Sequence, residues 1–121
     1  MSRPVLDESA IHPAVRDAVA RHHLDIVTEV QQAIARHPVV VVGMGWNPFV
    51  KKARQALDAA GVAHHDLDYG NYLSQWRRRN ALKMWSGWAT LPMVFVKGQL
   101  VGGASDVVRL IHSGELKTLL A

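Results

Sequence analysis

The sequence predicts an α/β domain in which a mixed sheet is covered by helices on both faces. A block of four valines at 39–42 has the composition of a strand buried on both faces. Residues 93–96 are equally apolar, and Lys97-Gly98 joins them to a short hairpin partner at 99–101. The order helix, strand, helix, strand, helix, hairpin, helix fits this architecture better than a helix bundle or an all-β domain.

The elements of the first half are separated by proline, histidine and glycine. Residues 1–12 are mixed in composition and are predicted to lack regular structure, whereas Pro13 opens a helix that runs to His22. Apolar residues at helical spacing predict a second helix over 25–35. After the valine strand, a third helix is predicted from Pro48 to about Ala60, before Gly61.

The second half begins with a weaker strand, predicted at 62–67. A basic amphipathic helix is predicted over 72–85, followed by the hairpin. Two terminal helices are expected at 106–112 and 115–120, and we find no internal repeat.

Composition favours one domain of ordinary size, with 121 residues, 49% of them hydrophobic and 20% charged. The longest apolar run, 38–44, is too short to cross a bilayer, and the N-terminus lacks a signal-peptide pattern. We therefore expect a cytoplasmic protein without a membrane partner. The absence of cysteine excludes disulfides and cysteine-ligated metal within the chain. A net charge of +4 is consistent with anionic partners.

Several separated segments carry recognisable motifs. Residues 39–54, Val-Val-Val-Val-Gly-Met-Gly-Trp-Asn-Pro-Phe-Val-Lys-Lys-Ala-Arg, resemble the thiol-bearing strand and helix of the glutaredoxin family. Thr-Leu-Pro at 90–92, Gly102-Gly103 and Ser-Gly-Glu-Leu at 113–116 resemble its cis-proline segment, glycine pair and C-terminal signature. Residues 79–90, Arg-Asn-Ala-Leu-Lys-Met-Trp-Ser-Gly-Trp-Ala-Thr, most resemble the monothiol subclass.

The resemblance covers residues 24–121 and implies a thioredoxin-like, three-layer fold with a mixed four-stranded sheet flanked by helices. Residues 1–23 lie outside it. We accordingly expect a partly helical N-terminal extension at 1–23 and a glutaredoxin-like domain at 24–121.

The positions of the two family cysteines hold Asn47 and Val50. A thiolate at a helix N-terminus is the nucleophile of thiol–disulfide exchange, and neither an amide nor an isopropyl group replaces it. No catalytic residue is therefore predicted. Asparagine is a preferred N-cap and Pro48 suits the next position, so we expect Asn47 to cap the helix. Direct contact between Asn47 and a ligand stays open beside this role.

The resemblance also implies a glutathione groove that this chain keeps only in part. Met44 stands where the family has a lysine, and Arg79 matches an arginine that would pair with the glycine carboxylate of glutathione or be merely solvated. Ala104 and Ser105 replace a Cys-Asp pair, with Asp106 as a substitute carboxylate and Ser105 as an alternative helix cap. The predicted groove comprises Met44, Asn47, Phe49, Arg79, Leu91, Pro92, Gly103, Ala104, Ser105 and Asp106.

One segment mixes tryptophan with arginine: Trp76, Arg77, Arg78 and Arg79, followed by Lys83, Trp85 and Trp88. Such mixtures bind nucleic acid through phosphate neutralisation and base stacking, or serve as protein-binding hot spots. We expect the plainer arrangement, in which the tryptophans pack inward and the arginines are solvated. Nucleic acid is retained as an alternative partner.

Histidine pairs at 22–23 and 64–65 do not predict a metal site, because adjacent side chains diverge in a helix and alternate in a strand. An iron–sulfur cluster of the monothiol type would lack its protein thiolate. Glutathione is the one cofactor that the resemblance leaves possible.

Two functions remain. The first is a non-catalytic binding module that uses the remnant groove for glutathione, a peptide or a protein partner. The second is a glutathione-dependent oxidoreductase in which bound glutathione supplies the sulfur and the protein only orients it. We favour the binding module because the reactive residues are missing.

Overall fold

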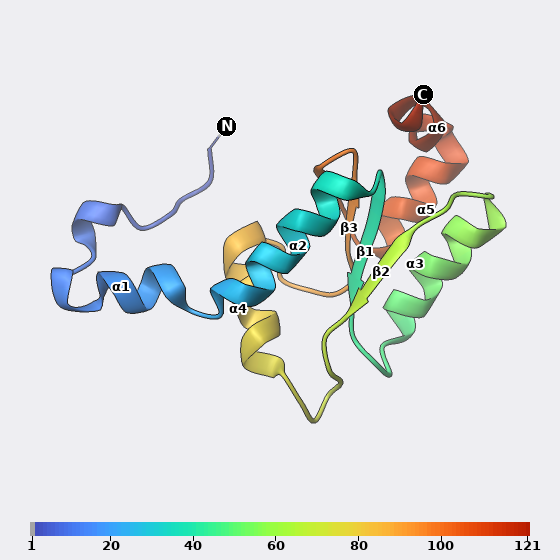
Figure 1. The fold of residues 1–121 in the computed structure, drawn as a ribbon. Coiled ribbons are helices and arrows are strands. Elements are labelled where there is room, and N and C mark those ends of the chain that lie inside the picture. The colour runs from blue at the N-terminus through green and yellow to red at the C-terminus, as the bar shows by residue number, and fades with distance from the viewer. Residues whose placement is uncertain (1) are drawn as a thin grey trace.

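The fold is organised around a four-stranded mixed sheet with the strand order β2-β1-β3-β4 (Figure 1). A computed structural model describes residues 2–121. Its elements are the 3-10 helix η1 (Glu8–Ala10), α1 (Pro13–Arg21), α2 (Leu24–Arg36), β1 (Val39–Gly43), α3 (Pro48–Ala59), β2 (His65–Asp68), α4 (Trp76–Ser86), β3 (Met93–Val96), β4 (Gln99–Gly102), α5 (Ala104–Ser113) and α6 (Glu115–Leu120). The predicted mixed sheet of four strands is confirmed.

Strand β1 lies inside the sheet and is buried along its whole length. It pairs parallel with β2, where Val40 faces His65, and antiparallel with β3, where Val40 faces Phe95. A strand with two neighbours and two covered faces has no polar side, which explains the unbroken run of valine.

Helices cover both faces of the sheet (Figure 1). Because successive side chains of a strand point to opposite faces, Val40 and Val42 join one core and Val39 and Val41 the other. The first core is completed by side chains of α2 and α4, among them Ile26, Val30 and Leu82. The second is completed by side chains of α3 and α5, among them Ala53, Leu57 and Val107. The predicted three-layer arrangement is confirmed.

Strand β2 begins at His65 rather than at residue 62. The backbone N–H of Val62 still donates to Leu57 O, so residues 62–64 complete the turn that leaves α3. There the His64 ring bridges two carboxylates, with Nε2 2.7 Å from Asp58 Oδ1 and Nδ1 2.6 Å from Asp66 Oδ1. Burial of the ring opposes its protonation, but the hydrogen bonds with Asp66 and Asp58 outweigh it and raise the pKa of His64.

Helix α4 begins at Trp76, four residues later than the amphipathic pattern predicts. Residues 71–74 form a turn instead, in which Leu73 N donates to Asn71 Oδ1 at 2.8 Å and Asn71 N donates to Ser74 Oγ at 3.2 Å. These side-chain hydrogen bonds offer the backbone an alternative to the helix. The prediction missed this competition.

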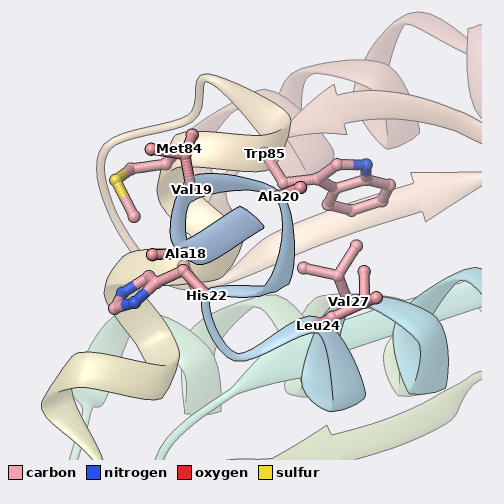
Figure 2. A pocket seen from close by; sticks show the side chains of 9 residues that line it. Ala18, Val19, Ala20, His22, Leu24, Val27, Met84 and Trp85 are labelled. Carbon is pink, nitrogen blue, oxygen red and sulfur yellow. The ribbon is translucent and has the colours of Figure 1, made fainter. Parts of the chain in front are cut away.

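The N-terminal extension carries α1, which projects to one side of the domain (Figure 1). The predicted helix at this place is confirmed, although its apolar residues Val15 and Val19 are about half exposed. Figure 2 shows Val19 beside Met84 and Trp85 of α4. These residues help to line an open apolar pocket of about 510 Å³ between α1, α2 and α4.

Within residues 2–121, no helix combines the length and the apolar character that crossing a bilayer requires.

Candidate functional site

The N-terminus of α3 is fully capped by Asn47. Its Oδ1 accepts from Phe49 N at 2.9 Å and from Val50 N at 3.2 Å. Its backbone carbonyl accepts from Lys51 N at 3.3 Å, and Pro48 has no N–H to offer. The predicted capping role is confirmed, and no backbone N–H in the first turn of α3 remains without a partner.

A shallow groove lies beside this capped end. It measures about 260 Å³ and is lined by Phe49, Trp88, Thr90, Leu91, Pro92, Gly103, Ala104, Ser105 and Asp106. We call it the cis-proline groove, because the Leu91–Pro92 peptide bond is cis. It unites most of the predicted groove residues, from Phe49 on α3 to Asp106 on α5.

Some residues that line this groove carry backbone groups without a partner in the described part of the chain. Within residues 2–121, neither the N–H nor the C=O of Leu91 takes part in a hydrogen bond. The same holds for the N–H groups of Ala104 and Ser105, in the first turn of α5. A helix N-terminus with open N–H groups and the positive end of the helix dipole favours an anion.

Helix α5 begins at Ala104 instead of residue 106, so the predicted cap by Ser105 is wrong. Asp106 takes the capping role from inside the helix, since its Oδ2 accepts from Gly103 N at 2.9 Å. This carboxylate packs so closely on Gly102, whose φ is 116°, that a Cβ at Gly102 would overlap it. The close approach explains why glycine is required there.

Arg79 lies apart from the cis-proline groove and is only 6% exposed. Its Nη1 donates to Tyr69 O at 2.9 Å and also to Ser74 O. Burial lowers the pKa of Arg79. The expectation that this arginine is solvated is therefore wrong, and its Nη1 serves the backbone of the loop before α4 rather than the groove.

Met44 and Asn47 line a second hollow at the N-terminus of α3, about 630 Å³ in volume. Met44 is buried, whereas Trp46 stands 66% exposed at its edge. Arg54 lies within this hollow and pairs through Nη2 with Asp68 Oδ1 at 3.0 Å. We refer to it as the Trp46 hollow.

Sequence reasoning did not include Trp46 among the site residues. Its φ of 64° places it in the left-handed region, which is uncommon for a bulky residue. The sequence did contain a signal for an exposed Trp46. This residue directly precedes the capping Asn47, and the loop that holds both is too short for the indole to reach the core.

The tryptophans of the arginine-rich segment do not all pack inward. Trp85 and Trp88 are partly buried against the first core, but Trp76 is 56% exposed. The Arg77 guanidinium lies over the Trp76 ring, 5.2 Å from its centroid. Exposed Trp76 and buried Arg79 thus reverse the expected arrangement at these two positions.

Comparison with known proteins agrees with the observed fold. A glutaredoxin family model matches residues 39–101, more than half of the chain. The chain belongs to the glutaredoxin family. The resemblance seen in its motifs is confirmed, and this member has no cysteine.

Individual relatives include monothiol glutaredoxins. A glutaredoxin-like protein of Dictyostelium discoideum is 39% identical over 102 residues, which make up 84% of this chain and 83% of that protein. A probable monothiol glutaredoxin of Legionella pneumophila is 35% identical over 72 residues, 60% of this chain and 78% of that protein. A crystal structure of a buckwheat glutaredoxin–glutathione complex shares the fold, with a TM-score of 0.71 at 21% identity over 83% of this chain and 91% of that one.

Proposed function

We propose that this glutaredoxin is a non-catalytic binding module whose cis-proline groove takes an extended, peptide-like ligand with a carboxylate. Glutathione is the first ligand to test, because it is a tripeptide with two carboxylates and is bound in the buckwheat complex.

The contrast between two helix N-termini carries this proposal. A thiolate is stabilised at a helix N-terminus by N–H groups and by the dipole. At α3 those N–H groups are already used, because Asn47 Oδ1 accepts from both Phe49 N and Val50 N. At α5 the N–H groups of Ala104 and Ser105 have no partner within residues 2–121. This contrast supports an anion site at the N-terminus of α5 rather than at that of α3.

The walls of the groove suit an extended backbone. The unpaired N–H and C=O of Leu91 match the donors and acceptors of a peptide lying antiparallel beside it, as in strand addition. Phe49 contributes an exposed ring along one side. A ligand in this position would place a carboxylate at α5 and its middle residue beside Leu91.

The alternative enzyme, in which bound glutathione supplies the sulfur, finds little support at α3. A glutathione thiolate there would meet the amide of Asn47 in place of open N–H groups. Met44, at the position of the family lysine, is buried and carries no charge. A thiolate-ligated iron–sulfur cluster does not fit these residues, since the chain has no cysteine.

Calorimetric titration with reduced glutathione, run beside a mixed-disulfide reduction assay, tests the proposal. We expect binding without turnover. Titration to ~10 mM nearly saturates even a site with a Kd of about 1 mM, so the absence of heat at that concentration would rule out glutathione as the ligand. Turnover would instead favour the enzyme.

Two variants locate the site. Phe49→Ala removes an exposed groove ring, and Ala104→Pro removes one N–H at the first position of α5, where proline is tolerated. Each should weaken binding severalfold while circular dichroism confirms the fold. Met84→Ala is the control, because Met84 is equally exposed but faces the pocket beside α1 (Figure 2). Equal effects of all three variants would contradict this placement.

A further inference from the structure

The loops that follow β1 and β2, together with the first turns of α3 and α4, carry a second group of exposed residues. It consists of Trp46, Tyr72, Leu73 and Trp76, each more than half exposed, together with the cations Lys51 and Arg77. We call it the aromatic surface. None of these residues lines the cis-proline groove.

Two loops bring the aromatic surface together. The loop from β1 to α3 carries Trp46, and the loop from β2 to α4 carries Tyr72 and Leu73; both lie at the lower end of the sheet in Figure 1. They are joined directly, since Gly45 N donates to Gly70 O at 2.7 Å. Lys51 lines the hollow beside Trp46.

The backbone beneath this surface is strained and braced. Trp46 and Gln75 both adopt left-handed φ angles, 64° and 56°, which cost free energy for residues other than glycine and concentrate at functional sites. Arg79 holds the second loop from inside through its bonds to Tyr69 O and Ser74 O. A buried guanidinium thus supports a loop whose tip displays apolar and aromatic side chains outward.

The charge of the surface is positive. Asp68 and Asp25, the nearby carboxylates, are paired with Arg54 and Arg78. Within residues 2–121, Arg77 and Lys51 have no ion-pair partner. Arg77 is stacked on the Trp76 ring, which keeps cation and aromatic face together.

We propose that the aromatic surface binds single-stranded nucleic acid. Unpaired bases stack on exposed aromatic rings without sequence preference, while cations between the rings neutralise phosphates. Trp46, Tyr72 and Trp76 supply three such rings, and Arg77 and Lys51 supply the charge. This activity is separate from ligand binding in the cis-proline groove.

The test is fluorescence anisotropy with a labelled oligo-dT of about twelve nucleotides, a length within the range of single-strand binding sites. We expect binding at low salt that is at least tenfold tighter than binding of a duplex of the same length. Trp46→Ala and Trp76→Ala should each weaken it by roughly tenfold, since stacking on one base is typically worth a factor of this order.

Charge variants separate phosphate contact from general basicity. Arg77→Gln should make the slope of log K against log salt less negative by about 0.7, the value for one phosphate contact on a single strand. Lys117→Gln is the matched control. Lys117 is an exposed residue of α6 at the opposite end of the domain, so this substitution removes one positive charge far from the aromatic surface.

Three results would overturn the proposal. The first is no binding at low salt. The second is binding that the tryptophan variants leave unchanged and that Lys117→Gln weakens as much as Arg77→Gln, which is attraction by net charge alone. The third is competition by polyglutamate as effective as competition by unlabelled oligo-dT at equal charge, which would assign the surface to acidic proteins.

Discussion

Replacing Arg79 distinguishes a structural arginine from a ligand-binding one. The family resemblance implies that this guanidinium binds the glycine carboxylate of glutathione, whereas the structure directs Nη1 to Tyr69 O and Ser74 O. Arg79→Met keeps much of the side-chain length and removes every donor. We therefore expect a loss of stability with little change in groove binding.

The loss in the free energy of unfolding can be worked out from the two carbonyls that Arg79→Met leaves without a donor. Each buried carbonyl without a donor costs about 1–3 kcal/mol, so two carbonyls set a range of about 2–6 kcal/mol. Arg79 has no carboxylate partner within residues 2–121, and burial lowers its pKa, so removing the charge recovers part of its desolvation cost. We expect a net loss of about 3 kcal/mol, near the lower end of the range.

Urea unfolding measures this loss directly. With an m value of about 2 kcal/mol per molar, the midpoint should fall by about 1.5 M. Arg79→Lys should fall between wild type and Arg79→Met, because an ammonium donates but lacks the planar fork. An unchanged midpoint together with lost glutathione binding would refute the structural role and restore the carboxylate role.

Three further changes have defined outcomes. Asn47→Ala should lower the free energy of unfolding by about 1 kcal/mol, whereas Asn47→Asp, which still caps, should not; equal losses would exclude capping as the cause. Leu57→Ala, in the second core, should cost about 2–5 kcal/mol in urea unfolding, and a loss below that range would mean that the core collapses around the gap. Because its pKa is raised, His64 stabilises the fold fully below about pH 6.5 and loses this effect as the pH rises through the folded-state pKa. The stability difference between wild type and His64→Gln should shrink over that interval, and a constant difference would contradict the linkage.

Much of the fold could be predicted because the strongest signals are local. The valine strand and the hairpin at Lys97-Gly98 are each encoded within a few residues and appear where expected. The start of α4 was not predictable from periodicity, because Asn71 and Ser74 satisfy backbone groups with their side chains in the turn before it. Side-chain hydrogen bonds of this kind compete with helix formation without altering the spacing of apolar residues, so periodicity does not reveal them.

The site divides in the same way. The cap by Asn47 depends on its own two neighbours and follows from residue type. The burial of Arg79 depends on carbonyls at Tyr69 and Ser74, which the fold brings to it and no motif records. Trp76 is the first residue of α4 and is 56% exposed, and no motif in the sequence records this exposure.

Asn47 does more than replace a nucleophile. A smaller residue at this position would have removed the thiol and left open N–H groups at α3, available to a ligand's own thiolate. The amide instead occupies Phe49 N and Val50 N. The first turn of α3 then has no open N–H donor, so the N-terminus of this helix cannot bind an anion through its backbone. Under the proposed function, the open first turn of α5 would be the remaining anion site of the groove, and binding there would require no chemistry from the protein.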